Sequence, residues 1–402
     1  MASYIILSSV VFLTYFSVGT TGPFLALYAQ SLGASLAQIA WVTGTYATTA
    51  LVANIFWGRQ MDRIGRRKPF LVGAMAVLTC TSITGAMVPT GHWWFLVPIR
   101  GIEGLAAGAY GVGSLAMMGD ILANHPRRAT MMGAYRMSGS LAFSIAILVA
   151  GTVAQRNGFR TIFFATGVTY GMALLTALFL REPQLQATTG RAIPSFRSML
   201  EGPMRPLFVL LLSFWMPMAA VVSIYGPFVA DYLGYGRDGY ARLWALAAFA
   251  EVPCMLLAGW LSDRYSRRLT FTLGLTAFAV VYLLYALATT TGGLVVAQLL
   301  RGFAYAAFTA TAMTMIVELS PADARGKAAS LFQVGQGMSG MLGNYAGGPV
   351  AQAFGYRTLF LACTVILMLG AVYAQVQLRV RQVLATPGGG VAGVSAAPAV
   401  KS

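Results

Sequence analysis

The sequence predicts an all-α membrane protein in which twelve transmembrane helices form two six-helix bundles. The chain of 402 residues is 57% hydrophobic and only 9% charged, with a mean hydropathy of +0.70. These values lie outside the range of soluble domains. About twelve apolar runs, each of ~20 residues, are long enough to cross ~30 Å of hydrocarbon at 1.5 Å per residue. An internal repeat divides these runs into two sets of six, as in many transporters.

The apolar runs follow one another with mostly short polar connections. The first run is interpreted as a span and not as a cleaved signal peptide, because residues 1–4 carry no cation and the run is too long. The predicted spans are 4–30, 36–57, 69–89, 93–119, 128–153, 159–180, 206–232, 240–261, 269–289, 293–317, 327–351 and 357–378. The proline-containing stretch 181–205 is expected to be a cytoplasmic linker between the bundles 1–180 and 206–380, and residues 381–402 a disordered cytoplasmic tail.

The distribution of cations predicts the orientation. The chain has 27 Lys and Arg against 11 Asp and Glu, a net charge of +16. Most of these cations fall in loops on the same side of the membrane as the N-terminus, so the positive-inside rule places both termini in the cytoplasm. Because no basic domain with interleaved aromatic residues lies outside the apolar runs, the charge does not indicate nucleic-acid binding.

The sequence predicts neither an enzyme nor a metalloprotein. His92 and His125 fall on opposite sides of the predicted membrane, and neither a nucleophile elbow nor a metal motif is present. Cys80, Cys254 and Cys363 lie within predicted spans at no metal-ligand spacing. We therefore expect no catalytic residue, no metal and no cofactor.

Four short motifs recur in the same order in the two halves of the chain. The pairs are GPF at Gly22 and Gly226, GRQMDRIGRR at Gly58 and GWLSDRYSRR at Gly259, Arg-Gly at Arg100 and Arg301, and NGFRTIFF at Asn157 and FGYRTLFL at Phe354. An ordered series of this kind indicates duplication. Each half contains an even number of spans, so the halves share one orientation, as in a parallel repeat.

These features resemble the major facilitator superfamily of secondary transporters. The resemblance rests on twelve spans in two halves and on the motif GxxxDRxGRR, matched by Gly58, Asp62, Arg63, Gly65, Arg66 and Arg67, with a weaker copy at Gly259, Asp263, Arg264, Arg267 and Arg268. The resemblance implies that this network latches the halves in the outward-open state. Asp120 and Glu318, at the cytoplasmic ends of the fourth and tenth spans, are the expected partners of the arginines. The alternative is that the loop only sets topology.

Charged residues inside spans are candidates for function, because each costs ~2.5–3.5 kcal/mol at the bilayer centre. Arg100 and Glu103 resemble the family's RxxQG motif, with Glu in place of Gln, and the resemblance implies a role in proton transfer. At a spacing of three they can instead neutralise each other on one helix face. Glu251, midway along the eighth span, suits a coupling proton or a cationic substrate, or is a neutral side chain bonded to a neighbouring helix. We expect proton coupling to use Glu103, Glu251 and Arg100.

Other polar residues of the spans are expected to line a central substrate cavity. They are Arg136, Arg301, Asn54, Tyr110, Tyr225, Gln333, Gln336 and Asn344. The positive surplus of intramembrane arginines over acids gives some weight to an organic-anion substrate. Each of these side chains can alternatively serve in helix packing or interhelical hydrogen bonding.

Together these features predict a secondary active transporter that works by alternating access. The RxxEG variant, the short loops and the apolar walls resemble the drug/proton antiporter branch, so the expected function is proton-coupled efflux of small amphipathic molecules or drugs. The fifth span lacks the proline of the Gly-Pro signature that many exporting relatives carry. Sugar or organic-anion transport in either direction, a lipid flippase and a transport-dead receptor therefore stay open. The expected partners of this monomer of the cell (inner or plasma) membrane are a small-molecule substrate, protons and the lipid bilayer.

Overall fold

The computed structural model describes residues 2–122, 125–182, 204–288, 290–318 and 325–385, and these ranges contain helices and turns but no strand. The side chains of 128–130, 204, 313–314, 316–318, 325–330 and 378–385 lie outside the description. The helices are α1 (Ala2–Thr21), α2 (Leu25–Ser31), α3 (Leu36–Ile64), α4 (Lys68–Ala86), η1 (Trp93–Phe95), α5 (Leu96–Ile121), α6 (Arg128–Asn157), α7 (Phe159–Leu178), α9 (Met204–Pro227), η2 (Phe228–Tyr232), α10 (Gly236–Arg264), α11 (Arg267–Ala286), α12 (Thr291–Glu318) and α13 (Arg325–Ala385). The predicted all-α fold is confirmed.

Ten stretches of the described chain are long and apolar enough to cross a membrane. The last of them, Leu331–Gln377, has 47 residues, enough for two crossings of ~20 residues each. Helix α5 is not among the ten, but it packs on α3 and α4 as a member of the bundle. Counting α5 and both parts of α13, the described residues contain the twelve predicted spans.

The break inside α13 explains one of the repeated motifs. Gly355 interrupts α13 with φ 83° and ψ 161°, and Gly158 separates α6 from α7 with φ 81° and ψ 173°. Positive φ strains any residue with a Cβ atom, so glycine is required at both turns. The repeat of NGFR as FGYR therefore encodes the same tight connection in each half.

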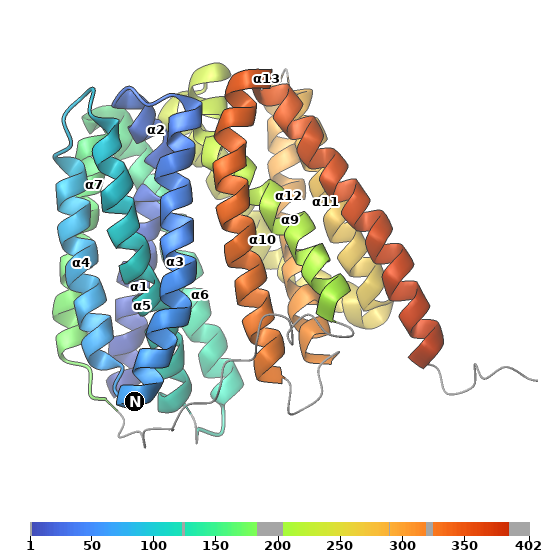
Figure 1. Ribbon diagram of the computed structural model, residues 1–402, viewed down its shortest axis with the longest axis horizontal. Helices are drawn as coiled ribbons and strands as arrows, with labels where there is room; N and C mark the ends of the chain where they lie inside the picture. The colour runs from blue at the N-terminus through green and yellow to red at the C-terminus, as the bar shows by residue number, and fades with distance from the viewer. Residues whose placement is uncertain (1, 123–124, 183–203, 289, 319–324, 386–402) are drawn as a thin grey trace, which may run out of the picture.

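The repeated Gly-Pro-Phe motif interrupts a helix in both halves, in two different ways. In the first copy the chain leaves α1 after Thr21 and resumes as α2 at Leu25, whereas the sequence predicted one continuous span. In the second copy α9 continues through Pro227 into the π-helix η2. Both interruptions lie at the end of the molecule away from the N-terminus (Figure 1).

Other helix boundaries differ from the predicted ones by a few residues. The side chain of Ser35 accepts a hydrogen bond from the backbone of Gln38, whose side chain accepts from the Ser35 N–H, so a capping box starts α3. The same helix ends at Ile64, seven residues past the predicted end, and is followed by Gly65, which has φ 69°. Helix α13 continues to Ala385, so the described part of the predicted tail, 381–385, is helical. Most of the predicted linker 181–205 lies outside the described residues.

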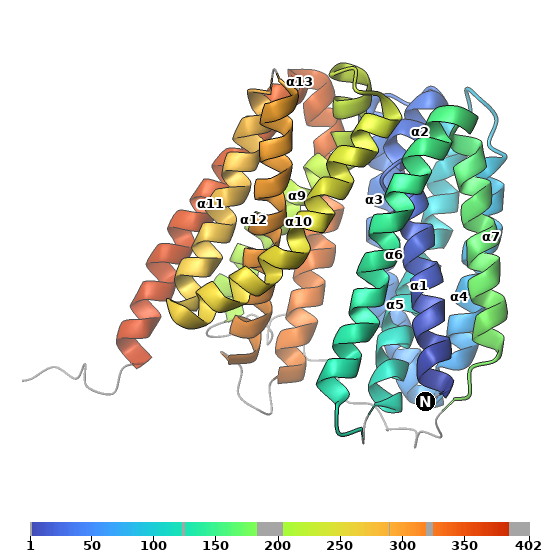
Figure 2. The ribbon, with the colours of Figure 1, turned by 180° about the vertical axis from the view of Figure 1, so that it is seen from behind.

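The helices form two groups that meet along a single seam. In the N-terminal half α3 packs on α5, α4 on α7, and α1 on α6 and α7; in the C-terminal half α9 packs on α13, α10 on α12, and α11 on α12 and α13. The main contacts between the halves join α3 to α13 and α6 to α10. Figures 1 and 2 show that the groups lie close together at the end away from the N-terminus and diverge toward the N-terminal end. We call these the distal and proximal ends.

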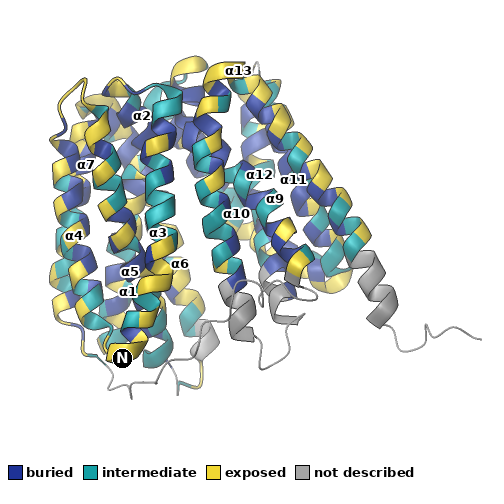
Figure 3. Cartoon of the chain, in the orientation of Figure 1, coloured by how far each residue is buried: buried dark blue, intermediate teal, exposed yellow. Residues whose placement is uncertain are grey.

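The outer surface of the helices is apolar, as expected for a protein surrounded by lipid. Large exposed hydrophobic side chains occur on most long helices, and Leu256 of α10 is 79% exposed. Buried residues gather where helices face one another (Figure 3). In water such a surface would be unfavourable, so the exposed side chains identify the lipid-facing side of each helix.

Candidate functional site

The seam between the halves is tightest in its distal part. A Cβ atom on Gly151 of α6 would lie 2.3 Å from the Cβ of Ala241 on α10. A Cβ on Gly348 of α13 would lie 2.0 Å from the carbonyl oxygen of Leu36 on α3. Only glycine permits this close approach of helices, so both contacts depend on it.

A set of polar contacts, which we call the distal clamp, joins the halves at this end. The Tyr240 hydroxyl donates a hydrogen bond to the carbonyl of Pro23 at 2.7 Å. The Arg237 guanidinium donates to the carbonyl of Ala154 at 2.8 Å and lies 4.0 Å from the centre of the Phe159 ring. Both donors come from the first turns of α10, and both acceptors are main-chain carbonyls of the N-terminal half. No motif in the sequence singles out these residues.

The two helices of the N-terminal half that lie at the seam, α3 and α6, each carry a polar residue on the side turned away from lipid. On α3, Val52 is exposed and Asn54 lies roughly 160° away around the helix axis, at 100° per residue. On α6, Leu141 is exposed and Arg136 lies roughly 140° away. Asn54 and Arg136, both predicted to line a cavity, therefore face inward.

The C-terminal seam helices follow the same pattern. On α10, Glu251 lies roughly 140° from the exposed Leu256. On α13, Gln333 lies roughly 180° from the exposed Leu342. All four seam helices thus carry a polar side chain on the face opposite their lipid-facing side, as a polar pathway between the halves would require.

In the N-terminal half, Arg100 is held by two partners. Its guanidinium forms an ion pair with Glu103 on the same helix and lies 4.0 Å from the centre of the Tyr46 ring on α3. Glu103 is only 6% exposed. Both charges are compensated within α5, which is the mutual neutralisation that the sequence left open as an alternative.

In the C-terminal half, Arg301 likewise lies over an aromatic ring. Its guanidinium is 4.3 Å from the centre of the Trp244 ring and donates to the side-chain oxygen of Gln298 at 3.5 Å. Gln298 is fully buried and donates in turn to the hydroxyl of Tyr225. Tyr225 is thus a buried support of Arg301 in this conformation. The position equivalent to Glu103 is Ala304, so Arg301 has no acid on its own helix face.

Glu251 lies on α10, the helix that also carries Trp244. Gly302, next to Arg301, packs against the Glu251 backbone, because a Cβ there would lie 2.9 Å from the Glu251 nitrogen. Among the described residues, no cation lies within 4.0 Å of the Glu251 carboxylate. Arg301 and Tyr305 are near enough to interact with it electrostatically.

The remaining cavity candidates differ in exposure. Arg136 and Gln333 are exposed, whereas Tyr110 is buried in the core of the N-terminal half. The Asn344 amide donates a hydrogen bond to the carbonyl of Gly340 in its own helix at 2.7 Å. This bond uses one of its two N–H donors. Gln336 is half-buried on α13.

Tyr15 of α1 is a further residue that sequence reasoning missed. It is 45% exposed and packs against Gly139 of α6. Its position on the first span gave no distinctive signal among the many aromatic residues of the chain.

At the proximal end, the first copy of the GxxxDRxGRR motif is partly engaged. Arg67 forms an ion pair with Asp120 at 2.8 Å. Asp62, Arg63 and Arg66 are exposed and make no hydrogen bond or ion pair with the described residues. Gly58 lies on α3, and a Cβ atom there would lie 3.6 Å from a methyl carbon of Val112 on α5.

The second copy of the motif has a different set of contacts. Asp263, near the end of α10, pairs with Arg267, the first residue of α11, at 3.2 Å. Arg268 bonds the side chain of Gln375 on α13 at 2.8 Å. Arg264 is exposed, and the side chain of Glu318 lies outside the described part of the chain.

Glu182 is another residue that the sequence did not single out. Its carboxylate accepts hydrogen bonds from the backbone N–H groups of Arg67 and Lys68, the latter at 2.9 Å. It therefore caps the N-terminus of α4, where a negative charge also complements the helix dipole. Lys68 completes the contact by donating to the carbonyl of Leu178 at 2.7 Å.

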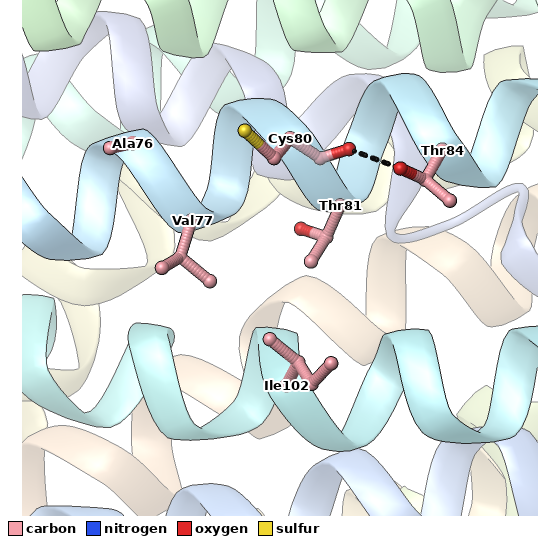
Figure 4. Close-up of a pocket in the computed structure, with 6 residues that line it drawn as sticks. All are labelled: Ala76, Val77, Cys80, Thr81, Thr84 and Ile102. Carbon is pink, nitrogen blue, oxygen red and sulfur yellow. Dashed lines mark hydrogen bonds between the residues drawn. The ribbon is translucent and has the colours of Figure 1, made fainter.

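A surface groove lies between α4 and α5 and is separate from these polar faces. It has a volume of about 410 Å³ and is lined by Ala76, Val77, Cys80, Thr81, Thr84 and Ile102 (Figure 4). Val77 and Ile102 are exposed apolar side chains, and the Thr84 hydroxyl is bonded to the Cys80 carbonyl at 2.8 Å. The groove offers no charged group and opens on the lipid-facing side. No cluster of metal-binding side chains occurs within the described ranges.

Comparison with known proteins gives a consistent result. The family described as Major Facilitator Superfamily matches residues 7–252 and 240–393. Multidrug resistance protein MdtG of Enterobacter lignolyticus (strain SCF1) is 25% identical over 382 residues, covering 92% of this chain and 90% of that protein. Multi-drug resistance efflux pump PmrA of Streptococcus pneumoniae serotype 4 is 24% identical, covering 92% of this chain and 94% of that protein. The crystal structure of the nucleoside transporter NupG has a TM-score of 0.77 at 16% identity, covering 94% of this chain and 100% of that one.

Proposed function

This chain is a member of the major facilitator superfamily, and from this premise we propose that it is a proton-coupled secondary active transporter that exports small amphipathic molecules. The observation that carries the proposal is the placement of Asn54, Arg136, Glu251 and Gln333 on the inward faces of the four seam helices. Charged side chains are expensive within a membrane and persist where they serve a polar pathway. Two bundles that rock about such a pathway can open it to each side in turn.

We assign the proximal end to the cytoplasm, where both termini would then lie. The basis is the concentration of cations in the loops on this side. With this orientation the conformation described here is open toward the cytoplasm and closed by the distal clamp. Asp62 and Arg66, which have no partner in the described residues, would then engage when the proximal end closes. Asp120, Asp263, Arg264 and Glu318 belong to the same proposed latch.

Glu251 is the carboxylate that we propose carries the coupling proton. It lies midway along α10, on an inward face, and has no ion-pair partner among the described residues within 4.0 Å. A proton on this carboxylate would change its interaction with Arg301 and so the relation of α10 to α12. Arg100 and Glu103, which the sequence analysis also assigned to proton coupling, form a closed pair on one helix, so we place them in a supporting role.

The relatives named as multidrug resistance and efflux proteins favour export of small amphipathic molecules by a transporter of the cell membrane. Apolar helix faces with few charges suit substrates that partition into lipid. Transport of a sugar or organic anion in either direction is the second candidate, favoured by the excess of inward-facing arginines. A lipid flippase is the third. For each candidate we expect the monomer to act without a cofactor.

Purified protein in liposomes tests the proposal directly. The liposomes contain a trapped pH-sensitive dye, and amphipathic compounds are added outside one at a time. We expect at least one compound to change the lumenal pH in wild-type vesicles and to leave it unchanged in Glu251→Gln vesicles with the same protein content. Compound uptake without any pH change would contradict proton coupling, and neither uptake nor pH change across the library would contradict transport.

A further inference from the structure

A polar pocket at the proximal end of the C-terminal half lies outside the seam. It is formed by the start of α11 and by α13, has a volume of about 320 Å³ and is lined by Ser266, Arg268, Leu269 and Gln375. The two helices pack on each other, and the start of α11 lies at the proximal end of the molecule (Figure 2). Arg268 is half-buried and is the one charged residue among the four that line the pocket.

The Arg268 side chain has a neutral partner and no acid. Its guanidinium donates to the side-chain oxygen of Gln375 through two nitrogens, at 2.8 Å from Nε. Among the described residues, no carboxylate lies within 4.0 Å of this guanidinium. The nearby Asp263 pairs with Arg267, and three arginines stand against this one aspartate over residues 263–268. The pocket therefore carries a positive charge that no acid compensates.

The first turn of α11 adds a main-chain donor beside this charge. The first N–H groups of a helix have no acceptor within the helix. The Ser266 hydroxyl accepts from the N–H of Leu269 at 3.0 Å, whereas the Arg268 N–H has no acceptor among the described residues. An anion in the pocket can be bound by the guanidinium, and the start of the helix adds to the attraction through this N–H group and the helix dipole.

The internal repeat shows an anion at the corresponding place in the N-terminal half. Aligning GRQMDRIGRR with GWLSDRYSRR pairs Arg67 with Arg268 and Lys68 with Leu269. The N–H groups of Arg67 and Lys68 both donate to the carboxylate of Glu182. In the C-terminal half the other wall of the pocket is α13, which contains no Asp or Glu. An anion at the start of α11 would therefore have to come from outside α13.

The surroundings of the pocket favour a lipid as the source of the anion. Leu269, at the edge of the pocket, is 40% exposed, and Leu273, one turn further along α11, is 39% exposed. On α13, Val372 is 59% exposed and lies three positions before Gln375, toward the membrane centre. Exposed apolar side chains thus lead from the pocket along both helices. Basic pockets between membrane helices bind phospholipid head groups in this way.

We propose that this pocket binds the phosphate of an anionic phospholipid from the membrane leaflet at the proximal end. The Arg268 guanidinium donates to the phosphate oxygens through the N–H groups that Gln375 does not use. The acyl chains lie along Leu273 and Val372. The lipid supplies to α11 the negative charge that Glu182 supplies to α4, and it joins α11 to α13. The site does not depend on the proposed transport function.

Lipid titration of the purified full-length protein in detergent micelles tests the proposal. The melting temperature is measured with dioleoylphosphatidylglycerol, with the zwitterionic dioleoylphosphatidylcholine and with inorganic phosphate. We expect the anionic lipid to raise the melting temperature, with a half-maximal concentration at least about ten-fold lower than that of the zwitterionic lipid, the size of a charge-assisted contact. Inorganic phosphate at the same concentrations should have no effect, because it lacks the acyl chains.

Variants locate the effect on Arg268. Arg268→Gln should raise the half-maximal concentration of the anionic lipid about ten-fold. Gln375→Leu breaks the same side-chain bond but keeps the charge, so its half-maximal concentration should stay within about two-fold of wild type. Arg59→Gln removes an exposed arginine at the proximal end of α3. It is the matched control for general attraction of anionic lipid and should also stay within about two-fold.

Three outcomes in wild type and Arg268→Gln would overturn the proposal: equal effects of the two lipids, an equal effect of inorganic phosphate, or an unchanged response of Arg268→Gln to the anionic lipid. A loss in Arg59→Gln as large as that in Arg268→Gln would show diffuse attraction to the arginine-rich proximal end and would also overturn it. If Arg268→Gln does not fold, the comparison of the three additives in wild type still decides between a lipid site and none.

Discussion

In the N-terminal half Arg100 lies over the ring of Tyr46 and pairs with Glu103 on its own helix. In the C-terminal half Arg301 lies over the ring of Trp244, and Glu251, the acid on which it acts, is on a different helix. Both halves thus retain a guanidinium over an aromatic ring, and this cation–π interaction contributes roughly 0.5–2 kcal/mol. The two acids differ in the helix that carries them: Glu103 is on the same helix as its arginine, and Glu251 is not. A partner on the same helix keeps its distance whatever the helices do, while a partner on a neighbouring helix moves when the helices move.

Duplicated halves can therefore take on different tasks. The N-terminal pair is suited to a fixed structural role, and the C-terminal pair to one that changes during a transport cycle.

Replacing Glu251 by Gln should have the largest effect. The amide cannot carry the coupling proton, so uphill transport driven by a pH gradient should fall to equilibration, while exchange of labelled for unlabelled substrate continues. Both are measured in liposomes with an imposed pH gradient. Uphill rates equal to those of wild type would show that the mobile acid lies elsewhere.

Replacing Glu103 by Gln should mainly reduce stability. The change leaves the largely buried Arg100 without its carboxylate, at an expected cost of roughly 2–3 kcal/mol, since one acceptor oxygen is retained. Thermal unfolding in detergent should show a clearly lower midpoint for this variant than for Glu251→Gln. If Glu103→Gln is as stable as wild type but loses uphill transport, the assignment of the fixed and mobile pairs is reversed.

The distal clamp is also asymmetric, because α10 supplies the Tyr240 and Arg237 side-chain donors and the N-terminal half supplies the carbonyls that accept from them. Tyr240→Phe removes the hydrogen bond to Pro23 and should shift the equilibrium toward distal opening by about 1 kcal/mol, roughly five-fold. Spin-label distances across the distal ends of the halves measure this shift. The control is Tyr232→Phe, whose exposed hydroxyl makes no hydrogen bond within the described residues; an equal shift in both variants would exclude the clamp.

The smallest effects on turnover are expected for the aspartates in the two copies of the GxxxDRxGRR motif at the proximal end. Asp62 has no partner among the described residues, whereas Asp263 at the end of α10 already pairs with Arg267 at the start of α11. Asp62→Asn should lower turnover about two- to three-fold, the size of an exposed ion pair, with unchanged equilibrium affinity for substrate. Asp263→Asn should change turnover less. Turnover and affinity are measured in the same liposomes, and an unaltered turnover in Asp62→Asn would exclude the latch.

Local patterns in the sequence were enough to predict much of this fold. Span number follows from hydropathy, and the turns at Gly158 and Gly355 follow from the repeat, because both depend on residues near one another in the chain. The pairing of Arg100 with Glu103 was one of two readings left open by their spacing. These features require no knowledge of which helices are neighbours.

The rest of the candidate site depends on contacts between distant helices. The rings of Tyr46 and Trp244, which lie under the two arginines, belong to helices that pack on α5 and α12. Aromatic residues are too frequent in this chain for the sequence to single out these two. Gln298 and the clamp residue Tyr240 were missed because their roles depend on contacts with residues on other helices. Periodicity tells which face of a helix is polar, but only the packing of the bundle tells what that face meets.

The carboxylate of Glu182 has a consequence for how the protein is made. The first turn of α4 receives its cap from a residue 114 positions later in the chain. While the ribosome is still producing the intervening helices, the amide groups of Arg67 and Lys68 must rely on water or lipid phosphate. The N-terminal half can reach its final arrangement only after its sixth helix has been inserted, so an arrested nascent chain that stops short of Glu182 should remain more sensitive to protease at the start of α4 than one that extends past it.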